Sequence, residues 1–466
     1  MTSYKKIDRE DILALDDILG HSGRLLHGED IDESYSHDEL VGSGSYPEVV
    51  AKPLSPAEVS GIMRLAWERN IPVTPRGAGT GLVGGAIPVH GGILLDMSLM
   101  NRIIELDEDN MTITVEPGVL LSELNALVEA RGLFYPPDPG EKNATLGGNI
   151  STNAGGMRAV KYGATREYAR GLEVVLPNGE IIEVGGKIVK NSSGYDLKDL
   201  IAGSEGTLGV ITKAILKLLP LPATTVSLLV PFPSLSQAIS VVPEIIRSRV
   251  IPTAIEFMER DILLYTEKYL DKKFPDNASP AYLLLRFDGQ TIKDIERDCE
   301  SVARICRERS AHDVFVFDTK ELEAPVWDIR GSFLDAIKKA TPAIEEVDAV
   351  VPRSEVSALV DYLRVVQEET GVPIQCYGHA GDGNVHVYLL KKSLDERDVN
   401  PNIKLAMDKI YDYAKELGGQ VSGEHGIGHE KREYLSASLS APVLELMRGI
   451  KKTFDPKNIL NPSKIL

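Results

Sequence analysis

The stretch TPRGAGTGLVGGAIP, residues 74–88, contains five glycines in nine residues, beginning at Gly77. Glycine lets a backbone approach a ligand closely and turn its N–H groups toward an anion. Gly79, Gly81 and Gly84 also have the G-x-G-x-x-G spacing of dinucleotide-binding folds. In those folds, however, the loop leads directly into a helix that meets the pyrophosphate. Residues 85–92, GAIPVHGG, cannot form that helix, so the spacing does not indicate a nicotinamide-binding fold.

The sequence before this loop predicts a β-α-β unit. Residues 48–53, EVVAKP, form an expected short strand, and Ser55 then caps a helix that runs to about residue 70. Pro56 suits the first turn of that helix, and Glu58 completes a capping box. IPVTP, residues 71–75, is a second short strand. The glycine-rich loop therefore follows a β-α-β unit and runs on into a third strand, ILLDM.

Glycine-rich loops recur downstream, at residues 136–156, 190–197 and 202–212. Between them the pattern predicts a strand at 111–118, a helix at 121–132 and a hairpin at 171–186 that turns at PNG. Serine, threonine and asparagine supply neutral hydrogen-bond donors in these loops. One large ligand with two phosphates explains several such loops at once. The alternative is that the glycines serve only tight turns.

The glycine-rich loops of the sequence end near LPLP, residues 219–222, which marks a candidate domain boundary. The chain beyond it alternates between apolar strands and amphipathic helices up to about residue 419. The expected strands are 224–232, 281–289, 312–318, 345–352, 372–379 and 384–390, and the expected helices are 234–249, 291–310, 354–371 and about 403–419. This alternation predicts an α+β layer domain, with two ferredoxin-like halves on one antiparallel sheet.

Composition limits the classes of function. The 466 residues carry a formal net charge of -18, which disfavours nucleic acid and anionic membranes as partners. No apolar run approaches the roughly 18 residues of a membrane span, and the charged beginning of the chain is unlike a signal peptide, so we expect a cytoplasmic protein. The three cysteines show no C-x-x-C spacing, so we interpret them as small buried hydrophobic residues.

Four of the nine histidines fall between residues 379 and 429. GHAGDGNVH places His379 and His386 on either side of a strong turn sequence, so the two imidazoles can converge on one ion. SGEHGIGHE adds Glu424 and His425 between glycines. Two histidines and one carboxylate suit zinc, iron or manganese with open coordination positions. The alternative is that these are ordinary turn and core histidines.

Five segments together resemble a known family, the FAD-linked 2-hydroxyacid dehydrogenases of the vanillyl-alcohol-oxidase-type superfamily. Within that family they are most similar to the group of D-lactate dehydrogenases and glycolate oxidase catalytic subunits. The segments are TPRGAGTGLVGG (74–85), NATLGGNISTNAGGMRAVKYG (143–163), SEGTLGVITKAILKL (204–218), YGHAGDGNVH (377–386) and SGEHGIGHEKREYL (422–435). The resemblance extends from about residue 40 to KNILNPSK (457–464).

The resemblance implies an α+β fold in which a two-subdomain FAD-binding domain is joined to an antiparallel-sheet, ferredoxin-like cap domain. Residues 1–220 would form the FAD-binding domain, with an N-terminal helical segment at about 1–40. Residues 221–420 would form the cap, or substrate, domain. Residues 421–466 would return to the FAD domain and the active site.

The resemblance also implies the residues that bind FAD. Thr80 stands where covalent members of the family have a flavin-linking histidine, so the FAD should be bound without a covalent bond. The implied contacts are Pro75, Arg76, Gly77, Ala78, Gly79, Thr80, Gly81, Ser98, Pro137, Asp138, Thr145, Gly148, Asn149, Ser151, Thr152, Gly155, Gly156, Gly163, Glu205, Gly206 and Ile211.

The family pattern assigns a divalent metal, zinc, iron or manganese, to His379, His386 and Glu424. It assigns the catalytic base to His425 and the clamp for the substrate carboxylate to Arg330. The metal would lower the pKa of the substrate hydroxyl, the base would take its proton, and hydride would pass to flavin N5. For Arg330 the alternative is a surface ion pair on a helix.

Substrate and partner are inferred in the same way. Relatives that oxidise 2-hydroxyglutarate place a lysine where this chain has Glu345 and Glu346, so we expect D-lactate or glycolate rather than a diacid. Tyr388 is a candidate to close the pocket. Because the chain has no motif for a second redox centre, electrons should pass to an electron-transferring flavoprotein, an iron-sulfur subunit or a quinone system. The competing hypotheses are a glycolate oxidase catalytic subunit, a D-2-hydroxyglutarate dehydrogenase, a metallohydrolase and a noncatalytic flavin-binding module.

Overall fold

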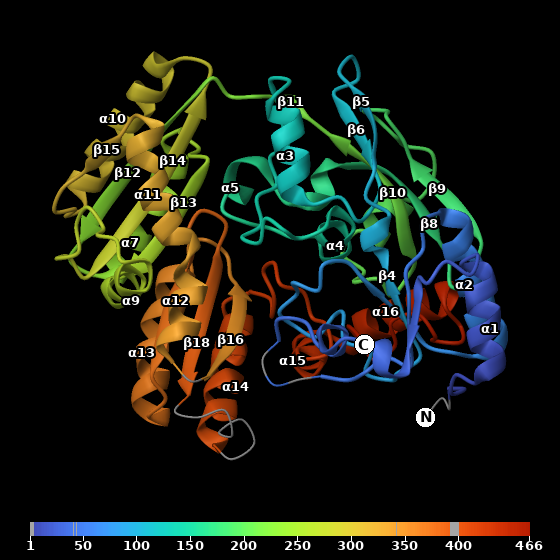
Figure 1. The fold of residues 1–466 in the computed structure, drawn as a ribbon. Helices are drawn as coiled ribbons and strands as arrows, with labels where there is room; N and C mark the ends of the chain where they lie inside the picture. The colour runs from blue at the N-terminus through green and yellow to red at the C-terminus, as the bar shows by residue number, and fades with distance from the viewer. Residues whose placement is uncertain (1–3, 41, 43, 342, 392–399) are drawn as a thin grey trace. The chain divides into compact units, whose positions relative to one another are not determined.

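A computed structural model describes residues 4–40, 42, 44–341, 343–391 and 400–466 (Figure 1). The chain divides into two compact units. Unit 1 comprises Met1–Ala154, Ala164–Leu221 and His425–Leu466, and unit 2 comprises Gly155–Gly163 and Pro222–Glu424. Each unit combines helices with at least one sheet, which confirms the expected α+β fold.

The predicted β-α-β unit is present at the start of unit 1. It consists of β2 (Val49–Ala51), α2 (Pro56–Arg69) and β3 (Val73–Arg76), and β4 (Ile93–Asp96) lies between the two strands and parallel to both. Ser55 caps α2 by accepting a hydrogen bond from the backbone N–H of Glu58. The expected capping box is incomplete, because the Glu58 carboxylate instead accepts hydrogen bonds from Leu54 N and from Arg24. β1 (Leu25–His27) extends this sheet in the antiparallel sense.

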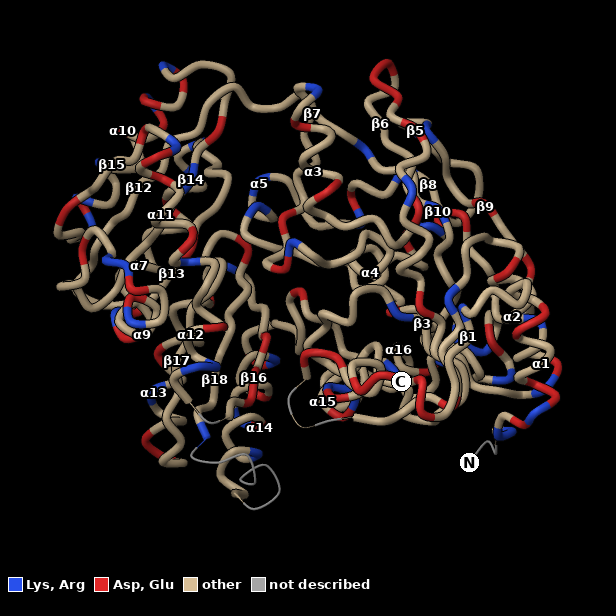
Figure 2. The backbone as a smooth tube through the Cα atoms, viewed as in Figure 1, with Lys and Arg blue, Asp and Glu red and all other residues tan. Residues whose placement is uncertain are grey.

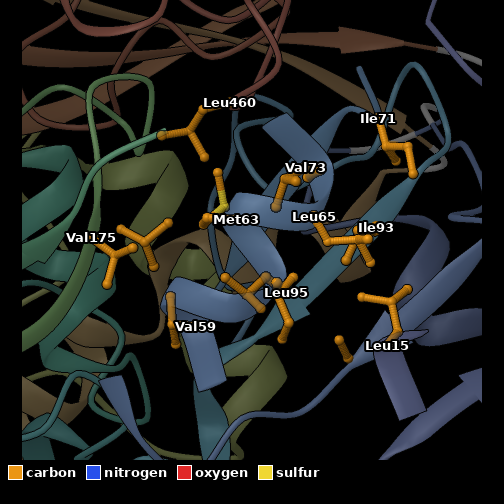
Figure 3. Close-up of a cluster of buried hydrophobic side chains, with 14 of the residues drawn as sticks. Leu15, Val59, Met63, Leu65, Ile71, Val73, Ile93, Leu95, Val175 and Leu460 are labelled. Carbon is orange, nitrogen blue, oxygen red and sulfur yellow. The ribbon is translucent and has the colours of Figure 1, made fainter. Parts of the chain in front are cut away.

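The core of this half of unit 1 is apolar and fully enclosed (Figure 3). Val59 and Met63 of α2 pack with Ile93 and Leu95 of β4, together with Leu15 of α1 (Arg9–Ile18). Fully burying a side chain of this size stabilises a fold by about 1.5–3 kcal/mol. Leu460, from the far end of the sequence, belongs to the same cluster and forms a β-bridge with Val73.

A second, antiparallel sheet completes unit 1. Its order is β5 (Ile103–Asp107), β6 (Thr112–Val115), β10 (Val210–Lys217), β8 (Ala169–Val175) and β9 (Ile181–Gly185). The hairpin predicted at 171–186 is β8–β9, with Val175 paired to Ile181. The other α-helices and short strands described in unit 1 are α3 (Leu121–Glu129), β7 (Leu133–Phe134), α4 (Leu146–Thr152), α6 (Leu197–Ile201), β11 (Leu219–Pro220), α15 (Arg432–Ser438) and α16 (Ala441–Phe454).

Unit 2 is built on one seven-stranded antiparallel sheet. In spatial order the strands are β15 (Phe315–Phe317), β12 (Thr224–Phe232), β14 (Ala281–Gly289), β13 (Ala254–Glu259), β17 (Ile374–His379), β18 (Asn384–Lys391) and β16 (Ala343–Val350). β12 to β15 have the 4-1-3-2 order of a ferredoxin-like fold. β16 to β18 repeat that order, with a single bridge between Val350 and Gln420 in place of a fourth strand. The two halves join where β13 pairs with β17.

Helices cover both faces of this sheet. α9 (Arg260–Leu270), α11 (Lys320–Gly331) and α12 (Phe333–Ala340) pack on the face that carries Met258 and Tyr377. The other face is covered by α7 (Leu235–Ser240), α10 (Ile292–Glu308), α13 (Val356–Thr370) and α14 (Pro401–Glu416). The short helix α5 (Ala159–Tyr162) also belongs to unit 2. The single helix expected at 234–249 is instead α7 followed by α8 (Val242–Arg247), because Pro243 lacks the N–H that would continue α7.

Charge is distributed along both units. Figure 2 shows Asp and Glu mixed with Lys and Arg on helices, strands and loops alike. Among the described residues, no helix combines the length and the apolar composition needed to cross a membrane.

Candidate active site

His379, His386 and Glu424 come together in unit 2. The Nε2 atoms of the two histidines are 3.3 Å apart. Glu424 Oε1 lies 3.4 Å from His379 Nε2 and 3.3 Å from His386 Nε2. Ligand atoms at about 2.0–2.1 Å from a tetrahedral zinc ion stand about 3.4 Å from one another. The three side chains therefore fit one divalent cation.

The β17–β18 hairpin places the two histidines. His379 is the last residue of β17, His386 lies in β18, and the turn between the strands needs Gly383 at φ 96°. A Cβ at Gly383 would overlap the carbonyl oxygen of Val351, so only glycine fits there. The sequence pattern correctly predicted this turn.

A buried carboxylate lies behind each histidine. Glu256 of β13 accepts a hydrogen bond from His379 Nδ1, with its two oxygens at 2.8 and 2.9 Å. Asp348 of β16 lies 3.6 Å from His386 Nδ1. Both carboxylates are 0% exposed. A carboxylate on Nδ1 favours the tautomer that keeps the proton there and leaves the Nε2 lone pair for a metal.

Asp348 also fixes Glu424. Its carboxylate accepts hydrogen bonds from Ser422 Oγ at 2.8 Å, Gly423 N at 3.0 Å and Glu424 N at 3.1 Å. Asn384 Nδ2 donates to the other oxygen at 2.7 Å. One buried charge therefore holds the segment that brings Glu424 to the two histidines.

The electrostatics of the triad also suit a cation. Burial lowers the pKa of His379, but the charges of Glu256 and Glu424 outweigh it and raise that pKa well above its usual value. Burial raises the pKa of Glu424, but His379 and His386 outweigh it and hold that pKa well below the usual range. The carboxylates therefore favour a positive charge at this point, which a divalent ion bound to the triad would supply.

Arg330 is a buried residue of this site, and the alternative of a surface ion pair is wrong. It lies near the end of α11, is 5% exposed and forms an ion pair with Glu256. Its guanidinium carbon Cζ lies 4.6 Å from the ring centroid of Tyr377 and 5.3 Å from that of Phe333. A planar guanidinium packed against aromatic rings suits a planar carboxylate ligand.

Glu345 and Glu346 are consecutive in β16, so their side chains point to opposite faces of the sheet. Glu346 faces the histidines, where its carboxylate accepts a hydrogen bond from Tyr388 Oη at 2.9 Å and lies 3.9 Å from His386 Nδ1. Glu345 points to the opposite face of the sheet and forms a buried ion pair with Lys391. Tyr388 is fully buried and also forms a hydrogen bond with Tyr377. Of these two glutamates, only Glu346 therefore adds negative charge to the site.

The glycine-rich loop of unit 1 has the properties of an anion site. Within the described chain, no backbone N–H from Gly77 to Gly81 donates a hydrogen bond to another residue. These residues are partly or fully exposed, so a ligand can reach them. Consecutive unpaired N–H groups form a concave anion-binding surface. The loop therefore fits the pyrophosphate of FAD through its backbone.

The same loop is packed too closely for larger residues. A Cβ at Gly77 would overlap Thr145 Oγ1, and a Cβ at Gly79, where φ is 74°, would overlap the Arg76 guanidinium. Thr145 caps α4, so two of the segments implied to bind FAD are adjacent. The Arg76 guanidinium donates to the carbonyls of Ser34 and His37. The Arg76 side chain therefore fastens the loop to the N-terminal segment.

The other implied FAD residues are placed as follows. Glu205 N donates to Ser151 O at 2.7 Å, which brings a third implied segment to α4. Asp138 forms an ion pair with Lys142. Pro75, Ala78, Thr80, Ser98, Pro137, Gly148, Asn149, Thr152, Gly206 and Ile211 belong to unit 1, whereas Gly155, Gly156 and Gly163 belong to unit 2, where a Cβ at Gly155 would crowd Glu424.

His425 is the first residue of the last segment of unit 1 and directly follows Glu424 in the chain. The Glu205 carboxylate holds this segment, because it accepts hydrogen bonds from Ile427 N and Gly428 N, each at 2.7 Å. Gly426 and Gly428 both have positive φ. His429 is exposed.

Sequence reasoning missed Glu256 and Asp348. The strand β13 was absent from the expected elements, although AIEFME has the apolar residues of a buried strand around its charged ones. Asp348 lies in a strand that was predicted, two residues after Glu346 and therefore on the same face. A charged residue in the middle of a buried strand was the available signal for both.

The chain is similar to FAD-binding proteins along most of its length. Residues 47–185 match the FAD binding domain family, and residues 221–465 match the family described as FAD linked oxidases, C-terminal domain. The chain is 43% identical to a D-lactate dehydrogenase of Anaerostipes hadrus, covering 99% of this chain and 98% of that protein. It is 41% identical to the glycolate oxidase subunit GlcD of Bacillus subtilis, covering 96% and 93%.

Solved structures show the same fold at low identity. p-Cresol methylhydroxylase with bound substrate superimposes with a TM-score of 0.81 at 17% identity, covering 99% of this chain and 98% of that chain. 4-Ethylphenol oxidase from Gulosibacter chungangensis has a TM-score of 0.78 at 17% identity, covering 100% and 98%. The fold is therefore the vanillyl-alcohol-oxidase type.

The fold and the matched domains define an FAD-dependent oxidoreductase. The chain belongs to the family of FAD-linked oxidases that includes this D-lactate dehydrogenase and this glycolate oxidase subunit. This confirms the resemblance drawn from the sequence.

Proposed function

We propose that this protein is a metal-assisted D-2-hydroxyacid dehydrogenase that oxidises D-lactate to pyruvate. The observation that carries the proposal is the triangle of His379, His386 and Glu424, which is linked through Glu256 to the buried cation Arg330. A metal and a guanidinium on one sheet face suit a small acid that carries a hydroxyl beside its carboxylate. The similarity to two D-lactate dehydrogenases, from Anaerostipes hadrus and Archaeoglobus fulgidus, supports lactate as the substrate.

Each residue has a role in this reaction. Arg330 binds the substrate carboxylate and orients it. His379, His386 and Glu424 would hold the divalent metal, which as a Lewis acid makes the substrate hydroxyl more acidic. His425 takes the hydroxyl proton as general base. FAD, held by the loop at 75–81 and by α4 without a covalent bond, supplies the acceptor for the hydride that leaves C2.

Regeneration of FAD requires an electron acceptor, and we include a redox partner protein in the proposal. The described residues contain no cluster of cysteines, and all three thiols are buried, with the pKa of each raised to about 12 by that burial. An electron-transferring flavoprotein or an iron-sulfur subunit would supply the missing redox centre.

Anaerobic titration tests the proposed function. Purified protein with bound FAD and zinc is mixed with D-lactate, L-lactate or glycolate while flavin absorbance is followed. We expect D-lactate to bleach the flavin fastest. Faster bleaching by glycolate would favour glycolate oxidation, the second candidate, which the similarity to the Bacillus subtilis glycolate oxidase subunit supports. Flavin that stays oxidised with all three acids would contradict both assignments.

Glu346 should discriminate against diacids. Its carboxylate lies among the site residues, so a second substrate carboxylate there would meet a like charge. Glu346→Gln keeps an acceptor for Tyr388 and removes the charge. We expect the ratio of kcat/KM for D-2-hydroxyglutarate to that for D-lactate to rise about tenfold, equal to ~1.4 kcal/mol. An unchanged ratio would show that Glu346 lies away from the substrate.

A further inference from the structure

Glu256 occupies an unusual position for a carboxylate. It lies in the middle of the sheet of unit 2, in β13, and is 0% exposed. Its strand neighbours Ile255 and Phe257 are fully buried apolar residues. Placing a charge at a fully buried position costs several kcal/mol unless close partners compensate it.

Among the described residues, both hydrogen-bond partners of Glu256 belong to the proposed active site. Its oxygens lie 2.8 and 2.9 Å from His379 Nδ1, and Oε2 also accepts a hydrogen bond from Arg330 Nη2. Register accounts for the first contact, because Glu256 is directly opposite His379 in the β13–β17 pair. One carboxylate therefore touches the residue that would bind the metal and the residue that would bind the substrate carboxylate.

The contact with His379 determines which nitrogen faces the metal. An imidazole that donates its Nδ1 proton to a carboxylate presents Nε2 as the lone-pair nitrogen. His379 Nε2 is the atom that faces His386 Nε2, at 3.3 Å, and Glu424 Oε1, at 3.4 Å. The same carboxylate also fixes the orientation of the ring.

The contact with Arg330 determines which side of the guanidinium is available. Glu256 holds Nη2, and the aromatic rings of Tyr377 and Phe333 lie against the guanidinium. Arg330 Nε is buried and has no hydrogen-bond partner among the described residues. A buried donor without a partner is rare, and it suits a ligand that supplies the missing acceptor.

We propose that Glu256 is a positioning residue that sets the metal site and the carboxylate clamp together. It orients His379 for the metal and Arg330 for the substrate, so that loss of its charge weakens both. This inference rests on the proposed function, because it assumes a metal on His379 and an acid substrate on Arg330.

Zinc affinity provides the first test. Wild-type protein with bound FAD and the variant Glu256→Gln are dialysed against zinc at concentrations set by a chelator, and bound zinc is counted by mass spectrometry. Glutamine has nearly the same volume, but its amide group cannot satisfy His379 and Arg330 with two acceptors. We expect zinc affinity to fall about 10–100-fold.

A matched control is available in Glu323→Gln. Glu323 is also a buried carboxylate of unit 2, but its oxygens accept hydrogen bonds from the hydroxyls of Thr225 and Ser227 and do not contact a histidine. We expect its zinc affinity to match that of the wild type. An equal loss in both variants would indicate a general effect of removing a buried charge and would overturn the proposal.

Substrate kinetics at saturating zinc provide the second test. With the metal site filled, Glu256→Gln should still raise KM for D-lactate more than it lowers kcat, because Arg330 has lost its anchor. Glu256→Asp keeps the charge on a shorter side chain and should recover part of the zinc affinity. Loss of FAD or of the far-ultraviolet circular dichroism signal would show that the Glu256→Gln protein is misfolded. In that case the zinc affinity and KM of Glu256→Asp decide the test.

The outcomes distinguish this inference from the proposed function. Wild-type affinity for zinc and wild-type KM in the Glu256 variants would overturn the inference alone. Wild-type protein that binds no zinc, manganese or iron would overturn the metal in the proposed function, and the inference with it.

Discussion

The variant His425→Ala is expected to keep its FAD and to reduce it with D-lactate about 10²–10⁴ times more slowly than the wild type, the usual contribution of a general base. Loss of the imidazole leaves the substrate hydroxyl without a group to take its proton. FAD should remain, because the glycine loop and α4 supply its proposed contacts and Glu205 still holds Ile427 and Gly428. Rapid mixing without oxygen measures the rate of flavin reduction directly.

His429→Ala is the control for that experiment. His429 is an exposed histidine four residues further along, and its Nδ1 lies 3.1 Å from the carbonyl oxygen of Ser463. The variant His429→Ala should therefore reduce its flavin at the wild-type rate. A rate for His425→Ala within tenfold of the wild type would place the base elsewhere. Loss of FAD from this variant would mean that His425 has a structural role.

The variant Asp348→Ala is expected to destabilise unit 2 by about 3–5 kcal/mol, the cost of breaking a buried charged network. Asp348 is 0% exposed and accepts hydrogen bonds from Asn384, Ser422, Gly423 and Glu424. Alanine leaves these donors without an acceptor, and the segment that carries Glu424 loses its anchor. Bound zinc should fall together with stability.

Urea denaturation can report on unit 2 alone. Trp327 is buried in unit 2, and the only other tryptophan, Trp67, can be replaced by phenylalanine. The fluorescence of Trp327 then reports the unfolding of unit 2 as urea is increased. Asp408→Asn is the control, because Asp408 forms an exposed pair with Lys404 on α14 and should change stability by less than about 0.5 kcal/mol. Equal midpoints for Asp348→Ala and this control would contradict the assigned role.

Local sequence signals predicted the elements that depend on local chemistry. Ser55 and Pro56 predicted the start of α2, and the turn residues predicted the β8–β9 hairpin and the loop between His379 and His386. These features depend on the φ preferences of glycine and on helix capping, which a few neighbouring residues determine.

The supporting charges of the site could not be predicted in the same way. Glu256 reaches His379 only because two strands separated by more than a hundred residues pair in one register. Arg330 is buried because α11 packs over that sheet, and the Arg76 side chain donates to two carbonyls of the N-terminal segment. Such contacts follow from tertiary packing, and single-sequence patterns carry little information about it.

The order in which unit 1 is completed has a consequence for its synthesis on the ribosome. Ile459 and Leu460 are fully buried in the core around α2, and the backbone of Val73 is hydrogen-bonded to Ile459 and Asn461 on either side of Leu460. The Asn461 side chain donates to the carbonyls of Gly85 and Glu205. All of unit 2 is translated before these residues emerge. The nascent chain can therefore fold unit 2 first. The FAD loops are fastened together only after the segment that follows unit 2 has been made.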